Sequence, residues 1–130
     1  MTILRLEVGQ VFWLIVPLFK KLSQPRPFLV YEINNTEYVL LKITTQEKDY
    51  IPQFLLVNKP NNFHKTSYID LNILVHISHD LFPYILNRTL GLEKQGKLPF
   101  QEDLNKIMKD INSCFNNKSF RGNRYEVRVK

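Results

Sequence analysis

The sequence predicts a small, mainly β domain with helices towards its C-terminus, an α+β fold, and three observations lead to this prediction. Six short segments combine β-branched and aromatic residues between turn-forming residues, which is typical of strands. These segments are almost continuously apolar and have short connections, which favours a small barrel over an open sheet. A later segment repeats apolar residues every three or four positions, as an amphipathic helix does.

The predicted strands follow one another through the first part of the chain. Asn34-Asn35 lies between the second and the third strand and predicts a tight turn, since asparagine tolerates left-handed backbone geometry. The two strands therefore form a predicted β-hairpin. A loop containing Pro60 separates the fourth strand from the fifth. The six predicted strands cover residues 11–16, 27–33, 38–43, 54–57, 67–71 and 74–77.

Two helices are predicted after the strands. Residues 81–90 form the first, with Ser78 and Asp80 as alternative N-caps. Pro83 fits its first turn and Gly91 its C-terminal end. The second helix has acidic residues in its first turn, which suit the positive end of the helix dipole. Its apolar stripe is predicted to join the core across the barrel mouth and consists of Phe100, Leu104, Ile107, Met108, Ile111 and Phe115.

Length and composition indicate one globular domain. A chain of 130 residues with 44% hydrophobic residues is long enough to bury a sizeable core. The longest apolar run, residues 11–19, is far shorter than the roughly 20 residues that a membrane span needs. A single cysteine, Cys114, excludes an intrachain disulfide and fits a reducing cytoplasm. We expect residues 1–117 to form the domain and residues 118–130 a basic extension.

The positive charge is concentrated in this extension. The net charge is +6, and the last thirteen residues contain five lysines and arginines against one acid, Glu126. Residues 124–130 alternate apolar and charged side chains, which predicts an edge strand with one basic face. The extension is either a solubilising tail or part of a surface for a polyanionic partner.

Two short motifs place an arginine and a hydroxyl at strand ends. Arg26 lies between Pro25 and Pro27. A proline restricts the residue before it to extended backbone geometry, so the backbone of Arg26 is fixed at the start of a strand. Another predicted strand ends in Thr44-Thr45. A guanidinium and a hydroxyl at the ends of neighbouring strands can hold a phosphodiester between them. The alternative is a solvated arginine at the exit of a loop.

Several other chemistries lack support in the sequence. The histidines His64, His76 and His79 have neither a cysteine cluster nor the helical spacing of zinc enzymes, so we expect no metal. The four glycines are scattered and form no phosphate-binding loop. We therefore expect no cofactor, and neither ATP use nor acyl transfer.

The order of these motifs resembles one protein family. Gly9-Gln10-Val11 opens the first strand, a basic loop bounded by prolines follows, and then come Arg26-Pro27 and the Ile43-Thr44-Thr45-Gln46 strand end. A further strand and a closing helix complete the series. In this order, over about residues 8–116, the chain resembles the MazF/PemK-like toxins of bacterial toxin–antitoxin systems. The resemblance implies a small SH3-like β-barrel of the MazF/PemK type.

The resemblance also implies an activity. These toxins are endoribonucleases that cut single-stranded RNA, including mRNA, without metal, and they leave 2′,3′-cyclic phosphate and 5′-hydroxyl ends. The arginine of the Arg-Pro pair and the first threonine of the strand end are their catalytic residues, which match Arg26 and Thr44 here. The resemblance thus implies transition-state charge stabilisation by Arg26, with acid catalysis as its alternative or additional role, and positioning of the phosphate by Thr44. Thr45 and Gln46 become supporting or base-contacting residues.

Other site residues follow from the same resemblance. Some members carry an acid on the strand that corresponds to residues 67–71, and Asp70 is the candidate general base here, with Asn72 nearby. An exposed carboxylate at a strand edge is the alternative for Asp70. The first loop shapes the RNA groove in the family, and the candidate RNA-binding residues outside the strand ends are Phe19, Lys20, Lys21 and His64.

The implied partners are single-stranded RNA, a second copy of the chain and a cognate antitoxin. The usual antitoxin of the family is a protein whose disordered tail occupies the RNA groove, whereas a related class with the same barrel is held by an RNA. The sequence leaves these two open. The alternative function is a non-catalytic barrel module that binds nucleic acid or protein, because small barrels host many functions.

Overall fold

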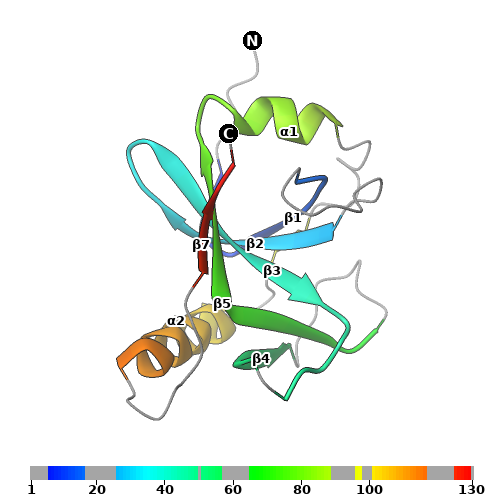
Figure 1. The fold of residues 1–130 in the computed structure, drawn as a ribbon, viewed down its shortest axis with the longest axis vertical. Coiled ribbons are helices and arrows are strands. Elements are labelled where there is room, and N and C mark those ends of the chain that lie inside the picture. Colours follow the sequence, from blue (N-terminus) through cyan, green and yellow to red (C-terminus); the bar gives the residue numbers. More distant parts are fainter. Residues whose placement is uncertain are drawn as a thin grey trace.

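The fold is mainly β, with one large sheet and two helices (Figure 1). The computed structural model describes residues 6–16, 26–49, 51–56, 65–88, 96–97, 101–116 and 125–129. Within these residues the elements are β1 (Gln10–Leu14), β2 (Arg26–Ile33), β3 (Glu37–Thr44), β4 (Gln53–Leu56), β5 (Ser67–Ser78), α1 (Phe82–Arg88), β6 (Gly96–Lys97), α2 (Gln101–Asn116) and β7 (Tyr125–Arg128). The prediction of a mainly β chain with a C-terminal helix is confirmed.

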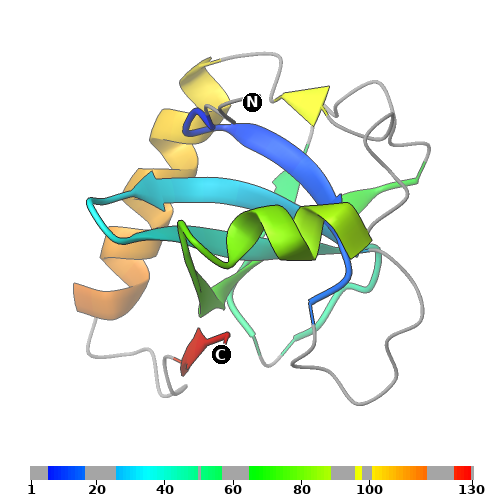
Figure 2. The ribbon, with the colours of Figure 1, turned by 90° about the horizontal axis from the view of Figure 1, so that it is seen from above.

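The strands form a seven-stranded sheet in the order β4-β5-β3-β2-β1-β6, and β7 pairs with β5 beside this path. Neighbours along the path are antiparallel. Figure 2 shows β1, β2 and β3 lying side by side in this order.

β5 is a single bent strand, and the prediction of two strands over residues 67–71 and 74–77 is wrong. The residues between them, Asn72-Ile73, include no glycine or proline that would end a strand. The bend comes from a register shift instead. Leu41 of β3 pairs with Leu74, whereas Ile43 pairs with Ile69, so that β5 carries extra residues opposite Lys42. Such a bulge bends a strand, and β5 turns a corner there in Figure 1.

The predicted hairpin between β2 and β3 is confirmed, but its asparagine acts differently from the prediction. The Asn34 side-chain oxygen accepts hydrogen bonds from the backbone N–H of Thr36 at 3.0 Å and of Glu37 at 2.8 Å. No described residue other than glycine has a positive φ angle. The turn is therefore held by a side-chain acceptor and not by left-handed backbone at asparagine.

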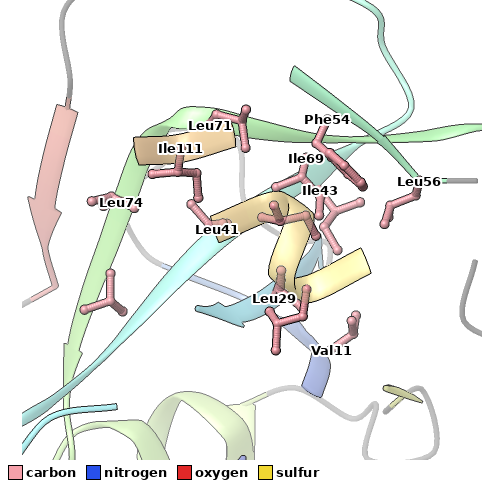
Figure 3. Close-up of a cluster of buried hydrophobic side chains, with 13 residues drawn as sticks. Val11, Leu29, Leu41, Ile43, Phe54, Leu56, Ile69, Leu71, Leu74 and Ile111 are labelled. Carbon is pink, nitrogen blue, oxygen red and sulfur yellow. The ribbon is translucent and has the colours of Figure 1, made fainter. Parts of the chain in front are cut away.

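The sheet has an apolar core on each face, because successive side chains of a strand point to opposite sides. On β2, Leu29 belongs to one cluster, whereas Phe28 and Val30 belong to the other. The α2 cluster, shown in Figure 3, comprises Val11, Leu29, Val39, Leu41, Ile43, Phe54, Leu56, Ile69, Leu71, Leu74, Leu104, Ile107 and Ile111. The α1 cluster comprises Phe12, Leu14, Val16, Phe28, Val30, Leu40, Val75, Ile77, Phe82, Ile85 and Val129.

Both predicted helices are confirmed, and α1 begins at Phe82, one residue after its predicted start. Ser78, one of the two alternative caps for α1, accepts a hydrogen bond from the backbone N–H of Leu81 at 3.1 Å, in the turn that precedes the helix. On α2 the stripe is narrower than predicted, because Met108 is 39% exposed while Ile107 is buried. The helical residues of the described chain form no segment that is long and apolar enough to cross a membrane. Gly91 and the side chains of Phe100 and Phe115 lie outside the described part.

The C-terminal strand predicted from alternation is confirmed as β7, which runs parallel to β5 at Ile73–His76. Val129, just after β7, is 8% exposed and joins the α1 cluster. His76 ties three strands together: its Nδ1 lies 2.9 Å from Glu37 of β3, and its Nε2 lies 3.5 Å from Glu126 of β7. Residues 125–129 are therefore an integral part of the fold.

Candidate active site

Arg26 and Thr44 lie at the same end of the β2–β3 ladder. Arg26 is the first residue of β2 and Thr44 the last residue of β3. Phe28 pairs with Lys42 in this antiparallel ladder, and two steps outward along each strand lead to Arg26 and Thr44. Side chains two residues apart on a strand share a face, so both residues emerge on the face that carries the α1 cluster. Arg26 is exposed and Thr44 is partly buried.

Side-chain hydrogen bonds fix the segment that follows Thr44. Thr44 Oγ1 accepts a hydrogen bond from the backbone N–H of Gln46 at 3.2 Å, which leaves the hydroxyl hydrogen available for donation to a ligand. The side-chain amide of Gln53, on β4, donates to the carbonyl oxygen of Gln46 at 3.0 Å. Thr45 and Gln46 are both exposed. The strand end predicted from sequence thus presents one anchored hydroxyl and two accessible polar side chains.

Asp70 of β5 lies next to the segment that follows Thr44 and is fully buried, with 0% of the residue exposed. The Gln53 amide donates to Asp70 Oδ1 at 2.8 Å, and Lys48 Nζ lies 3.7 Å from Asp70 Oδ2. Gln53 also accepts a hydrogen bond from the backbone N–H of Lys48 at 2.9 Å. The carboxylate therefore joins β5 to β4 and to the segment after β3. Asn72, the other nearby polar residue of β5, is also buried.

Lys42 also belongs to this group of residues, although it is part of none of the motifs in the sequence. It is a partly buried residue of β3, two positions before Thr44 and opposite the corner of β5. Burial lowers the pKa of Lys42, the positive charges of Lys48 and Arg26 lower it further, and the carboxylate of Asp70 opposes them. The signal in the sequence was a lone charge in the otherwise uncharged segment 38–43, in a strand with apolar residues on both faces.

The site is consequently rich in positive charge. Lys48 Nζ lies 3.7 Å from the buried carboxylate of Asp70, and Lys42 experiences the charges of Lys48, Asp70 and Arg26. Such an arrangement suits an anionic ligand, because a phosphate can replace the water that otherwise solvates the cations. The described residues contain no group of three histidines, cysteines or acids that could hold a metal ion.

Four predicted RNA-binding residues fall outside the part of the chain that the structure describes. They are Phe19, Lys20, Lys21 and His64. The other predicted site residues, Arg26, Thr44, Thr45, Gln46 and Asp70, come from three strands and the segment after β3, and they converge at one end of the sheet.

The comparisons with known proteins add no assignment to this geometry: no family model matches the chain, and no curated protein matches it with significance.

Proposed function

We propose that this chain is a metal-independent endoribonuclease of the kind found in MazF/PemK-like toxins, acting on single-stranded RNA in the cytoplasm. The observation that carries the proposal is the placement of Arg26 and Thr44 on one face at the same end of the β2–β3 ladder. A guanidinium and a hydroxyl in this position offer donors to two oxygens of one phosphodiester. The excess of positive charge around them supports an anionic substrate.

The proposed reaction is an attack of the RNA 2′-hydroxyl on the neighbouring phosphorus. It forms a 2′,3′-cyclic phosphate and releases a 5′-hydroxyl. Arg26 stabilises the charge that develops on the non-bridging oxygens, because its fixed donors need no reorganisation during the reaction. Thr44 donates its hydroxyl hydrogen to the same phosphate. Thr45 and Gln46, both exposed beside it, contact the flanking base or sugar.

Asp70 has a different role in this proposal from the general base suggested by the family resemblance. Its carboxylate is fully buried and already engages Gln53 and Lys48. A group in this position acts by fixing the segment that carries Thr44 and Gln46, and it does not need to reach the 2′-hydroxyl. We therefore propose Asp70 as a positioning residue.

The proposal extends to architecture and partners. The bend of β5 brings both halves of this strand against β3, which supports closure of the sheet into a small SH3-like barrel. Two copies of the chain form a homodimer with RNA along their interface. An antitoxin, a protein in the usual case, inhibits the enzyme by occupying the same groove.

The test is cleavage of a pool of single-stranded RNAs of varied sequence by the purified chain in EDTA. We expect cuts at discrete sites with cyclic-phosphate ends. The Arg26→Ala variant should lose about 10²- to 10³-fold in rate, as enzymes do when they lose one donor to a developing oxyanion.

Arg128→Ala is the matched control, because Arg128 is also an exposed arginine, on β7, with a 63% exposed side chain. It removes the same charge and should leave the rate almost unchanged. Equal losses in the two variants would show a general electrostatic effect and no catalytic role for Arg26. A folded wild-type protein that binds the pool without cutting any member would overturn the nuclease and favour the non-catalytic binding module.

A further inference from the structure

Lys42 is a partly buried cation next to the two residues proposed to bind the phosphate. It lies on the same face of β3 as Thr44 and opposite Phe28, two residues from Arg26 on β2. The register shift of β5 places Asp70 and its neighbours across from Lys42. On β3, Lys42 thus lies between β2, which carries Arg26, and β5, which carries Asp70, and it is two residues before Thr44.

The residues already assigned are poor proton donors. The arginine guanidinium does not release its proton in proteins. A threonine hydroxyl is still less acidic. Cleavage of the bond between phosphorus and the 5′-oxygen produces an alkoxide, which is a poor leaving group until it is protonated. Protonation of this oxygen by the protein requires a third group.

We propose that Lys42 is the general acid of the cleavage reaction, an inference that rests on the proposed ribonuclease function. As the 2′-oxygen bonds to phosphorus, the bond from phosphorus to the 5′-oxygen breaks and its electron pair stays on that oxygen. The 5′-oxygen takes a proton from Lys42 Nζ. Solvent water accepts the proton of the 2′-hydroxyl, and solvent later returns a proton to Lys42.

The charges around Lys42 support this role. Burial, Lys48 and Arg26 make the ammonium a stronger acid by lowering its pKa, whereas Asp70 limits the effect and favours the protonated form. Since the acid must be protonated to act, the cleavage rate should fall as the pH rises through the pKa of Lys42. Arg26 on β2, Lys48 after β3 and Asp70 on β5 are the charged groups that set this pKa.

The test compares two RNAs that differ in one atom at the bond that wild type cuts. One has the natural 5′-oxygen, and the other has sulfur in its place. A thiolate leaves without protonation, so the sulfur substrate does not need a general acid. Lys42→Ala should cut the natural RNA about 10²- to 10⁴-fold more slowly than wild type, the usual contribution of a general acid. It should cut the sulfur RNA within about tenfold of the wild-type rate.

Two further variants separate proton donation from charge. Lys42→Arg keeps a positive charge but cannot give up a proton, so it should remain slow on the natural RNA and fast on the sulfur RNA. Arg26→Ala removes charge stabilisation and should be slow on both. Equal losses for Lys42→Ala on both substrates, or no loss on either, would overturn the role of Lys42.

The outcome for the wild type distinguishes this inference from the proposed function. A wild type that cuts neither RNA ends the ribonuclease proposal, and the inference with it. A wild type that cuts both, with Lys42 variants that behave alike on both, overturns the inference alone. If the Lys42 variants fail to fold, the pH profile of the wild type decides. The loss of rate at high pH must appear with the oxygen substrate and vanish with the sulfur substrate.

Discussion

At the scale of single residues, Lys42 places an ammonium where the folded protein solvates it poorly. Burial is the first cause of its lowered pKa, and repulsion from Lys48 adds to it. A lysine whose pKa is lower in the folded than in the unfolded state reduces stability at every pH where both states are protonated. The site therefore holds its cation at a cost to folding, as functional groups often do.

This cost predicts that Lys42→Met raises the free energy of unfolding at about pH 7. The pKa of lysine in an unfolded chain is about 10.4. Between the lowered pKa and this value the unfolded state binds more protons, so wild-type stability rises with pH. The advantage of the variant should accordingly shrink as the pH approaches about 10.4, in urea unfolding followed by circular dichroism.

Lys109, an exposed residue of α2, offers the matched control. Lys109→Met makes the same chemical change without removing a buried ammonium, so it should alter stability little. A lower stability of Lys42→Met at neutral pH would show that contacts of the ammonium outweigh its desolvation.

At the scale of elements, the sequence predicts a feature correctly where residues close together in the chain determine it. Asn34 accepts backbone hydrogen bonds in the β2–β3 turn, and Ser78 accepts one in the turn just before α1. The continuity of β5 was missed, because a bulge opposite Lys42 is set by pairing with β3 and leaves no turn residues in the sequence. The exposure of Met108 was missed for a related reason, since periodicity alone does not fix the width of a buried stripe.

Helix α2 provides a sharp test of which face supports the sheet. Ile107 is fully buried in the α2 cluster, whereas its neighbour Met108 is 39% exposed. Ile107→Ala should lower the free energy of unfolding by about 2–5 kcal/mol, because it removes buried methyl groups and leaves a cavity. Met108→Ala should change it by less than about 1 kcal/mol. Thermal or urea unfolding of both variants measures the difference, and similar losses would contradict this packing.

At the scale of the whole molecule, the candidate site divides into a part that the sequence could reveal and a part that only folding creates. Arg26 and Thr44 were identifiable because each belongs to a short motif at a strand end. Lys42 and Gln53 carry no such motif. They join the site through the order β4-β5-β3-β2, which brings four strands to the same corner. Single residues whose role depends on this long-range pairing cannot be recognised from local sequence.

The proposed binding of RNA at this corner predicts a dependence on salt concentration. For single-stranded nucleic acid, the logarithm of the binding constant falls with the logarithm of salt concentration by about 0.7 for each phosphate contact. Arg26→Ala should make this slope shallower by about 0.7, whereas Arg128→Ala should not change it. Fluorescence anisotropy from about 50 to about 300 mM KCl measures the slope with an RNA whose 2′-hydroxyls are methylated, because this RNA cannot be cut. Identical slopes for the two variants would mean that RNA does not contact the corner formed by β2 and β3. A shallower slope for Arg26→Ala, together with an unchanged cleavage rate for Arg128→Ala, would indicate that RNA binding and cleavage occur at the same corner.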